Sequence, residues 1–198
     1  MMDGHSMGQT AEGPQAVQFA TYTAMKAVQR WLLWKEVPQE GRKPLKVPHY
    51  VNGSKRGATD TPDDWAQLTS YDATKAALAQ RGEGWGLAFA LGPDGTGGHW
   101  QGVDYDDVEA KGLGSIANRW AKGDLHDWGH VEISPSGTGA HVIGYGRQFP
   151  ALGSNATGIE AYSAGRFFTV TEQERRAMPP VTGTVQRSSA HKKTGVCS

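Results

Sequence analysis

Residues 130–145, HVEISPSGTGAHVIGY, contain two short apolar segments on either side of a turn of small residues. The segments 130–133 and 140–145 have the length and composition of β-strands. The connection between them is too short for the crossover that parallel strands require, so the two strands should be antiparallel neighbours. This stretch therefore predicts a sheet built largely from antiparallel strands.

Further strands are expected on both sides of this hairpin. Their ranges are 31–34, 43–51, 84–91, 99–108, 158–162 and 166–171. The segment 43–51 should lie at a sheet edge, because its prolines cannot donate the hydrogen bonds that a central strand needs. Asn52-Gly53 directly after it is a strong turn signal.

Helices are expected at 16–30, from Pro62 onward, at 73–81 and at 115–122. Thr61 can cap the helix that begins at Pro62, and Asp72 can cap the next one. The helices and strands do not alternate regularly, as they would in a parallel α/β protein. The predicted fold class is therefore α+β with a largely antiparallel sheet.

The composition is that of a folded protein, with 37% hydrophobic and 20% charged residues in 198 positions. No apolar run is long enough to cross a membrane. The single cysteine, Cys197, excludes an internal disulfide and agrees with a cytoplasmic location. We expect a flexible leader at 1–14, one folded domain at 15–177, and a flexible tail or linker at 178–198.

The net charge is zero, yet basic residues dominate 26–56 and acidic residues dominate 57–109. An enzyme that holds a polyanion beside a cation site would have such a distribution. Ordinary variation of surface charge gives it as well.

Two carboxylates, Asp104 and Asp106, lie two residues apart in the expected strand 99–108. Alternate residues of a strand face the same side, so the two should project together. Such a pair repels itself unless a cation neutralises it, and oxygen ligands suit Mg²⁺ or Mn²⁺. The pattern predicts a two-metal phosphoryl-transfer site. A solvated acidic turn is the alternative.

The turn between 133 and 140 is the second candidate site. Its small residues can direct backbone N–H groups at phosphate oxygens, and His141 stands beside them. A hairpin with a structural histidine is the alternative. The turn lacks the lysine and the following helix of a P-loop, which argues against a Walker-type ATPase.

The third candidate is Glu160, which lies between the apolar residues Ile159 and Ala161. A hairpin turn at 163–165 should bring Arg166 back beside it. A carboxylate and an arginine so placed can complete a metal site and grip a triphosphate. A cross-strand ion pair is the alternative.

The order of these three motifs resembles the archaeo-eukaryotic primase superfamily, in particular the bifunctional primase–polymerase domain of phage, plasmid and mobile-element replication proteins. The resemblance covers about 31–171 and includes the KPLKVP segment at 43–48 and GRFFTVT at 165–171. It implies a palm-like sheet related to the RNA-recognition motif, with helices and a smaller N-terminal α/β lobe.

The resemblance also implies roles for single residues. Two Mg²⁺ or Mn²⁺ ions would be held by the catalytic carboxylates Asp104, Asp106 and Glu160. The nucleotide would be bound by Ser136, Gly137, Thr138, Gly139, His141 and Arg166. The implied activity is that of a nucleotidyltransferase, a DNA primase or DNA polymerase, that uses dNTPs or NTPs on single-stranded template and primer–template. Many relatives carry a helicase after this domain, so a replicative helicase is an expected partner.

Contacts to template phosphates are expected from Lys43, Lys46, Lys55 and Arg56. Lysines on an edge strand also protect it from aggregation, which is the alternative interpretation of Lys43 and Lys46. Two other functions remain open. One is a replication-initiation or DNA-binding module that keeps the fold without synthesis, and the other is a metal-dependent nuclease.

Overall fold

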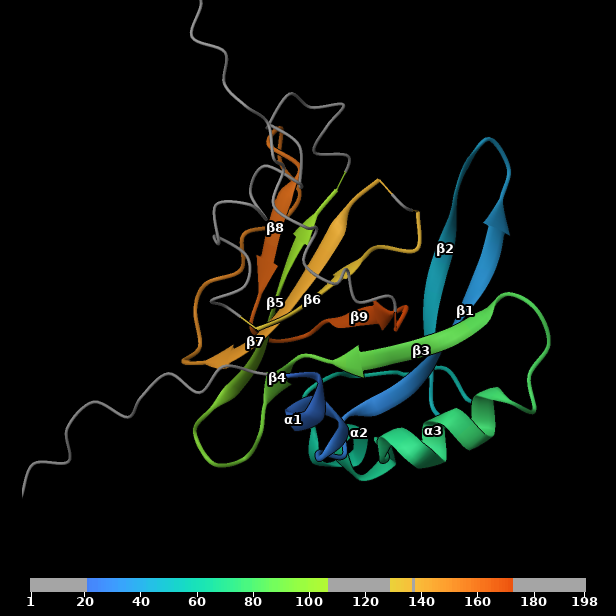
Figure 1. Ribbon diagram of the computed structural model, residues 1–198, viewed down its shortest axis with the longest axis horizontal. Coiled ribbons are helices and arrows are strands. Elements are labelled where there is room, and N and C mark those ends of the chain that lie inside the picture. The colour runs from blue at the N-terminus through green and yellow to red at the C-terminus, as the bar shows by residue number, and fades with distance from the viewer. Residues whose placement is uncertain (1–20, 107–128, 137, 173–198) are drawn as a thin grey trace, which may run out of the picture.

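The computed structural model describes residues 21–106, 129–136 and 138–172. Within these residues the strands form two antiparallel sheets, which lie side by side in Figure 1. The predicted α+β class with largely antiparallel strands is confirmed. The expected helix at 115–122, the leader, the tail and Gly137 lie outside the described residues.

The first sheet has the order β2-β1-β3-β9. Its strands are β1 (Trp31–Gln39), β2 (Arg42–His49), β3 (Trp85–Ala90) and β9 (Phe167–Val170). The second has the order β4-β5-β7-β6, and β8 pairs with β5 on the side away from β7. Its strands are β4 (Gly92–Pro93), β5 (His99–Tyr105), β6 (His130–Ile133), β7 (Ala140–Gly146) and β8 (Ile159–Tyr162).

Three helices of the described region, α1 (Tyr22–Lys26), α2 (Pro62–Gln67) and α3 (Tyr71–Leu78), lie along the first sheet (Figure 1). The Thr61 cap is confirmed, since its hydroxyl accepts from the N–H of Asp64 at 3.2 Å. The Asp72 cap is wrong: α3 begins earlier, and the Ser70 hydroxyl accepts from the N–H of Ala73. No helix among the described residues is long and apolar enough to cross a membrane.

The predicted edge strand is confirmed, because β2 ends the first sheet. The predicted hairpin around 163–165 is wrong. The chain does turn there, with Gly165 at a φ of 68°, but β8 pairs with β5 and β9 pairs with β3. The turn therefore carries the chain from one sheet to the other rather than between neighbours in one sheet.

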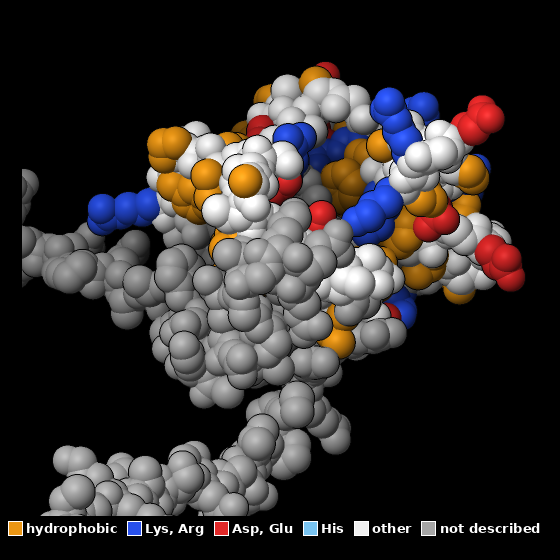
Figure 2. Space-filling model, turned by 90° about the horizontal axis from the view of Figure 1, so that it is seen from above, with side chains coloured by type: hydrophobic (Ala, Val, Ile, Leu, Met, Phe, Trp, Pro, Cys, Tyr) orange, Lys and Arg blue, Asp and Glu red, His pale blue; other side chains and the backbone are white. Residues whose placement is uncertain are grey.

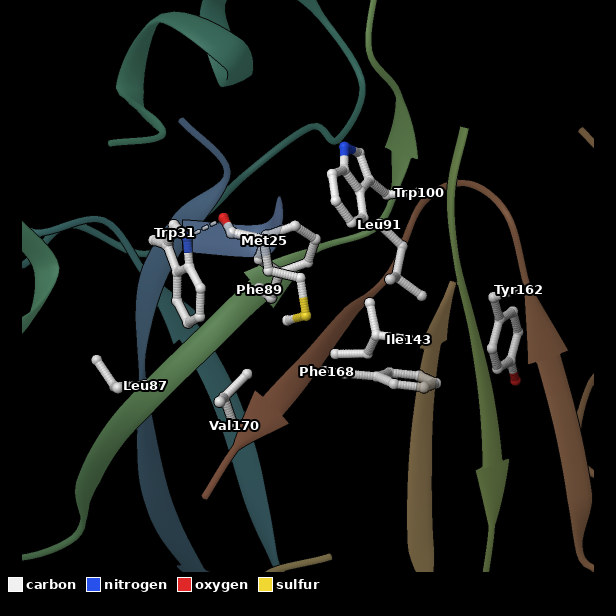
Figure 3. Close-up of a cluster of buried hydrophobic side chains, with 10 residues drawn as sticks. All are labelled: Met25, Trp31, Leu87, Phe89, Leu91, Trp100, Ile143, Tyr162, Phe168 and Val170. Carbon is white, nitrogen blue, oxygen red and sulfur yellow. Dashed lines mark hydrogen bonds between the residues drawn. The ribbon is translucent and has the colours of Figure 1, made fainter. Parts of the chain in front are cut away.

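From above, the surface between the sheets is hollowed, and hydrophobic side chains in the hollow are flanked by Lys and Arg (Figure 2). Below it, one buried cluster joins the two sheets and α1 (Figure 3). Its members are Met25, Trp31, Leu87, Phe89, Leu91, Trp100, Ile143, Tyr162, Phe168 and Val170. Since both sheets contribute to one core, their strands hold fixed positions relative to one another.

A glycine permits this contact between the sheets. Phe168 of β9 packs on the backbone of β5 at Gly102, where a Cβ would meet the ring at Cε2 and, at 2.7 Å, Leu91. Any side chain at position 102 would push the two sheets apart. Gly102 lies two residues before Asp104, so this close approach also sets where Asp104 stands relative to β9.

Candidate functional site

The ionisable residues of the second sheet form one row across four strands. Asp104 of β5 is the register partner of His141 on β7 and of Glu160 on β8. His141 is in turn the partner of Glu132 on β6. Directly opposed residues share a face with their Cβ atoms about 5 Å apart. The row therefore places Glu132, His141, Asp104 and Glu160 side by side, in that order.

Asp104 is the crowded centre of this row. Its Oδ1 lies 3.5 Å from His141 Nε2, and its side chain is 30% exposed. Burial raises the pKa of the Asp104 carboxyl above its ordinary value, and the like charges of Asp106 and Glu160 raise it further against the attraction of His141. An ionised Asp104 is therefore costly here and is suited to a cationic partner.

Glu160 and Arg166 both contact Tyr162. The Tyr162 hydroxyl donates to Glu160 Oε2 at 2.6 Å, and the Arg166 guanidinium lies over the Tyr162 ring, 4.7 Å from its centre. The prediction that Arg166 returns to the neighbourhood of Glu160 is confirmed, although the strands do not pair. Burial and the bond to Glu160 raise the pKa of Tyr162, so its hydroxyl remains a donor.

A cavity of about 220 Å³ opens at this row. It is lined by Lys46, Asp104, His141, Glu160, Tyr162, Arg166, Phe167, Phe168 and Thr169. Two carboxylates, two cations and a histidine thus line one opening. The residues come from both sheets, since Lys46 lies on β2 and Asp104 on β5. The cavity therefore sits where the two sheets meet.

Asp106 is not among the lining residues. Its backbone N–H donates to Gly158 O at 2.8 Å, and its half-exposed carboxylate lies 3.9 Å from Lys43 Nζ. The structure therefore keeps Asp106 next to the row but directs its charge toward Lys43.

The turn after β6 is tied together by its own side chains. Ser136 Oγ lies 2.9 Å from Ser134 Oγ and 3.1 Å from Thr138 Oγ1, and the N–H of Gly139 donates to Ser134 Oγ. Ser136 and Thr138 are exposed and do not line the cavity. Of the residues predicted to bind nucleotide, the structure brings His141 and Arg166 to the cavity.

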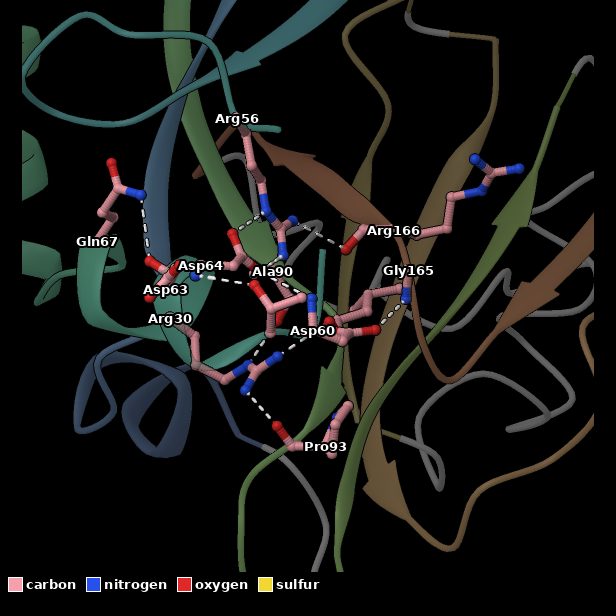
Figure 4. Close-up of polar contacts among 12 residues, drawn as sticks. Arg30, Arg56, Asp60, Asp63, Asp64, Gln67, Ala90, Pro93, Gly165 and Arg166 are labelled. Carbon is pink, nitrogen blue, oxygen red and sulfur yellow. Dashed lines mark hydrogen bonds and ion pairs between the residues drawn. The ribbon is translucent and has the colours of Figure 1, made fainter. Parts of the chain in front are cut away.

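Arg56 lies in the interior, and its guanidinium contacts both oxygens of Asp64 at 2.7 and 2.6 Å. This placement does not suit the predicted contact with template phosphates. Figure 4 shows Arg56 reaching the backbone carbonyl of Arg166 while the Arg166 side chain points away from this cluster. Lys43 and Lys55 are exposed, whereas Lys46 is half-buried at the cavity.

The carboxylates can be tested against the divalent ions that the sequence predicts. Within the part of the chain that is described, no three His, Cys, Asp or Glu side chains converge closely enough to hold a metal ion. Glu160 is turned toward Tyr162 and Asp106 toward Lys43. The oxygen donors and the raised pKa of Asp104 do fit a hard cation. The two outer carboxylates would have to rotate toward Asp104 to complete the site.

The sequence prediction missed two features of the site. It did not include Glu132, and it did not place Lys46 at the cavity. Glu132 could have been found, because a hairpin that pairs Ile133 with Ala140 also pairs Glu132 with His141. A charged residue inside an apolar strand was the signal. Lys46 had no such signal, since its approach to Asp104 depends on how the two sheets pack.

Comparison with known proteins adds one relative. No protein-family model matches the chain. The chain is 27% identical over 157 residues to a protein named DNA Primase-polymerase from Nitratiruptor phage NrS-1. The matched region covers 75% of this chain and 20% of that protein. The chain thus spans about a fifth of the length of the curated relative to which it is similar.

Proposed function

We propose that this domain is a template-directed nucleotidyltransferase, a DNA primase or DNA polymerase, that acts in the replication of a phage, plasmid or mobile element. The observation that carries the proposal is the row of His141, Asp104 and Glu160 at a cavity that also holds Arg166. The similarity to the phage protein named DNA Primase-polymerase supports it. We further propose that the sheet of β5–β8 is the palm-like part and that β1–β3 belong to the smaller lobe.

The charged residues and the histidine at or beside the cavity each have a task in this proposal. Asp104, Asp106 and Glu160 would bind Mg²⁺ or Mn²⁺, which would activate the attacking hydroxyl and neutralise the leaving pyrophosphate. His141 lies at the cavity with Nε2 on the side of Asp104, where the ring would contact a phosphate oxygen. Arg166 and Lys46, which line the same cavity, neutralise the triphosphate. Positioning and charge neutralisation supply most of the rate enhancement.

The nucleic acid would approach from the side of β2. Lys43 is 74% exposed and lies 3.9 Å from Asp106, so a template phosphate and this carboxylate would compete for it. Lys55 extends the basic surface beyond β2. Arg56 is left out of this proposal, because its guanidinium is fully buried against Asp64. Ser136, Thr138 and Gly139 are retained as the nucleotide-binding turn.

The testing experiment is primer extension by the purified chain. A labelled primer–template is incubated with each dNTP or NTP singly, with Mg²⁺ or Mn²⁺, and bare single-stranded template is used in parallel to detect new chains. We expect addition of the complementary nucleotide only. Asp104→Asn should lower the rate by roughly 100-fold or more, because a carboxylate that neutralises the transition state is lost.

Glu83→Gln is the matched control, since it removes an exposed carboxylate that does not line the cavity. It should extend primers at the wild-type rate. Wild-type activity in Asp104→Asn would contradict the assignment. Binding of DNA without any incorporation would favour the replication-initiation module, and template-independent cleavage would favour the nuclease.

A further inference from the structure

The fourth member of the row, Glu132, has no task in the proposed reaction. It lies on β6 and is fully buried, with neighbours in the strand that are apolar or buried. A buried carboxylate is costly unless hydrogen bonds and positive charge surround it. Its partners therefore indicate what the fold gains from keeping a charge at this position.

Three groups surround the Glu132 carboxylate. The N–H of Thr171 donates to both oxygens, at 3.0 and 3.1 Å. His130 Nε2 lies 3.4 Å from Oε2, and His141 Nδ1 lies 3.8 Å from Oε1. Burial favours a neutral acid here, but the bonds from His130, His141 and Thr171 outweigh it and hold the pKa of Glu132 below its ordinary value. The carboxylate remains charged behind His141.

The His141 ring is held from this buried side. Its Nδ1 donates to the carbonyl of Thr169 at 3.1 Å, since a carbonyl only accepts. Nε2, on the other edge of the ring, lies 3.5 Å from Asp104 at the cavity. Phe168 packs on the ring at 4.9 Å between centres. Glu132 lies opposite His141 in the ladder, and its carboxylate is 3.8 Å from the same Nδ1 edge of the ring.

We propose that Glu132 is the positioning residue of the nucleotide site: it holds the His141 ring so that Nε2 faces the triphosphate. The inference rests on the proposed function, because the triphosphate is the ligand that His141 is proposed to bind. Glu132 acts at the same time on β9, since its bonds to Thr171 fix the strand that follows Arg166. Through Glu132, the position of His141 is thus coupled to that of the strand that follows Arg166.

A merely structural role for Glu132 predicts a different outcome. If the carboxylate only joined β6 to the segment after β9, its loss would lower the melting temperature and leave nucleotide affinity unchanged. If it positions His141, nucleotide affinity must fall, and this loss must depend on His141. Residues that act through one another give non-additive effects in a double-mutant cycle.

The test uses the full chain and the variants Glu132→Gln, His141→Ala and their combination. Glu132→Gln keeps the size of the side chain and an acceptor for the Thr171 N–H. We expect the KM for dNTP to rise about tenfold in Glu132→Gln, the cost of losing a charged partner, with a smaller change in kcat. The double variant should be no worse than His141→Ala alone.

The control is Glu172→Gln, which removes a carboxylate just after the same strand. Glu172 bonds Tyr22, Tyr71 and Lys75, and it does not line the cavity. This variant should lower the melting temperature and leave the KM unchanged. An unchanged KM in Glu132→Gln, or losses that add in the double variant, would overturn the positioning role.

Two further measurements separate this proposal from the proposed function. The rise in melting temperature caused by dNTP with Mg²⁺ reports binding without turnover, and it should be reduced in Glu132→Gln. The ¹⁵N shifts of the His141 ring should change in Glu132→Gln and stay unchanged in Glu172→Gln. If the wild type binds dNTP but never extends a primer, the proposed function fails and the role of Glu132 stands. Unchanged ring shifts and binding in Glu132→Gln reject the role of Glu132 alone.

Discussion

Asp104 shows how the fold can hold a single carboxylate at a cost in stability. Its carboxylate is partly buried between His141 and Glu160, and its ionised form is disfavoured there by burial and by like charges. The pKa of the Asp104 carboxyl is higher in the folded protein than its ordinary value of 3.8 in the unfolded chain. The protonated carboxyl therefore contributes its full stabilisation below pH 3.8, and this stabilisation is lost as the pH rises through the folded-state pKa.

The raised pKa of Asp104 predicts how the variant Asp104→Asn changes thermal stability. At pH 7 and without divalent ions, the variant should melt at a higher temperature than the wild type, because it carries no ionised group at this position. The difference should shrink as the pH is lowered through the raised pKa of Asp104, below which the wild-type carboxyl is protonated as well. Thermal unfolding across this pH range measures it.

The same variant provides the metal test. Added Mg²⁺ should raise the melting temperature of the wild type, since an ion that binds only the folded state stabilises it, and should leave Asp104→Asn nearly unchanged. If both proteins respond alike, the ions bind elsewhere. If Asp104→Asn melts lower than the wild type at pH 7, the burial cost assigned to Asp104 is contradicted.

At the scale of the strand, β5 is the element on which both the site and the packing depend. It pairs with β7 along its whole length and with β8 over its second half. Gly102 lets Phe168 rest on its backbone. Asp104 then follows on the same face, two residues later.

Gly102→Ala should therefore destabilise the fold by about 1–3 kcal/mol, the usual cost of overpacking a filled interior. It should also lower the extension rate, because residues of both β5 and β9 line the cavity. Gly57→Ala is a suitable control, since a Cβ at Gly57 would have no atom within 4 Å. Urea unfolding compares the two, and equal stabilities would contradict the close approach at Gly102.

The individual strands were largely predictable, and their pairing was only partly so. The hairpin of β6 and β7 is local, so its short connection determines a register that the sequence already contains. The turn at 163–165 looks the same whether the strands beside it pair with each other or not. Which strands pair depends on β3 and β5, which are distant in sequence from this turn: β5 pairs with β8, and β3 pairs with β9. Local patterns do not encode that choice.

For the molecule as a whole, a buried polar network connects the segment after β2 to the turn before β9 (Figure 4). Asp64 accepts from Arg56 and from Tyr50, whose hydroxyl lies 2.8 Å from Oδ1. Asp60 accepts from the N–H of Gly165 at 2.6 Å. The backbone at Arg166 is thus held by residues more than a hundred positions earlier, a link that no local pattern contained.

Asp64→Asn should cost about 3–5 kcal/mol, because it leaves the buried Arg56 charge without its carboxylate. Burial opposes ionisation of Asp64, but the bonds from Arg56 and Tyr50 hold its pKa below the ordinary value. Its stabilisation is therefore present above pH 3.8 and is lost as the pH falls through the lower folded value. Asp63→Asn, at an exposed neighbour, is the control in denaturant unfolding. Equal stability of the two variants would contradict the network.

The position of the cavity at the junction of the sheets has a mechanical consequence. Lys46 belongs to one sheet and His141 to the other, so a triphosphate bound by both would link the two sheets. Binding of the substrate would then stabilise the packing of the two sheets against local opening, and amide hydrogen exchange in β1 and β3 would slow although no residue of either strand lines the cavity.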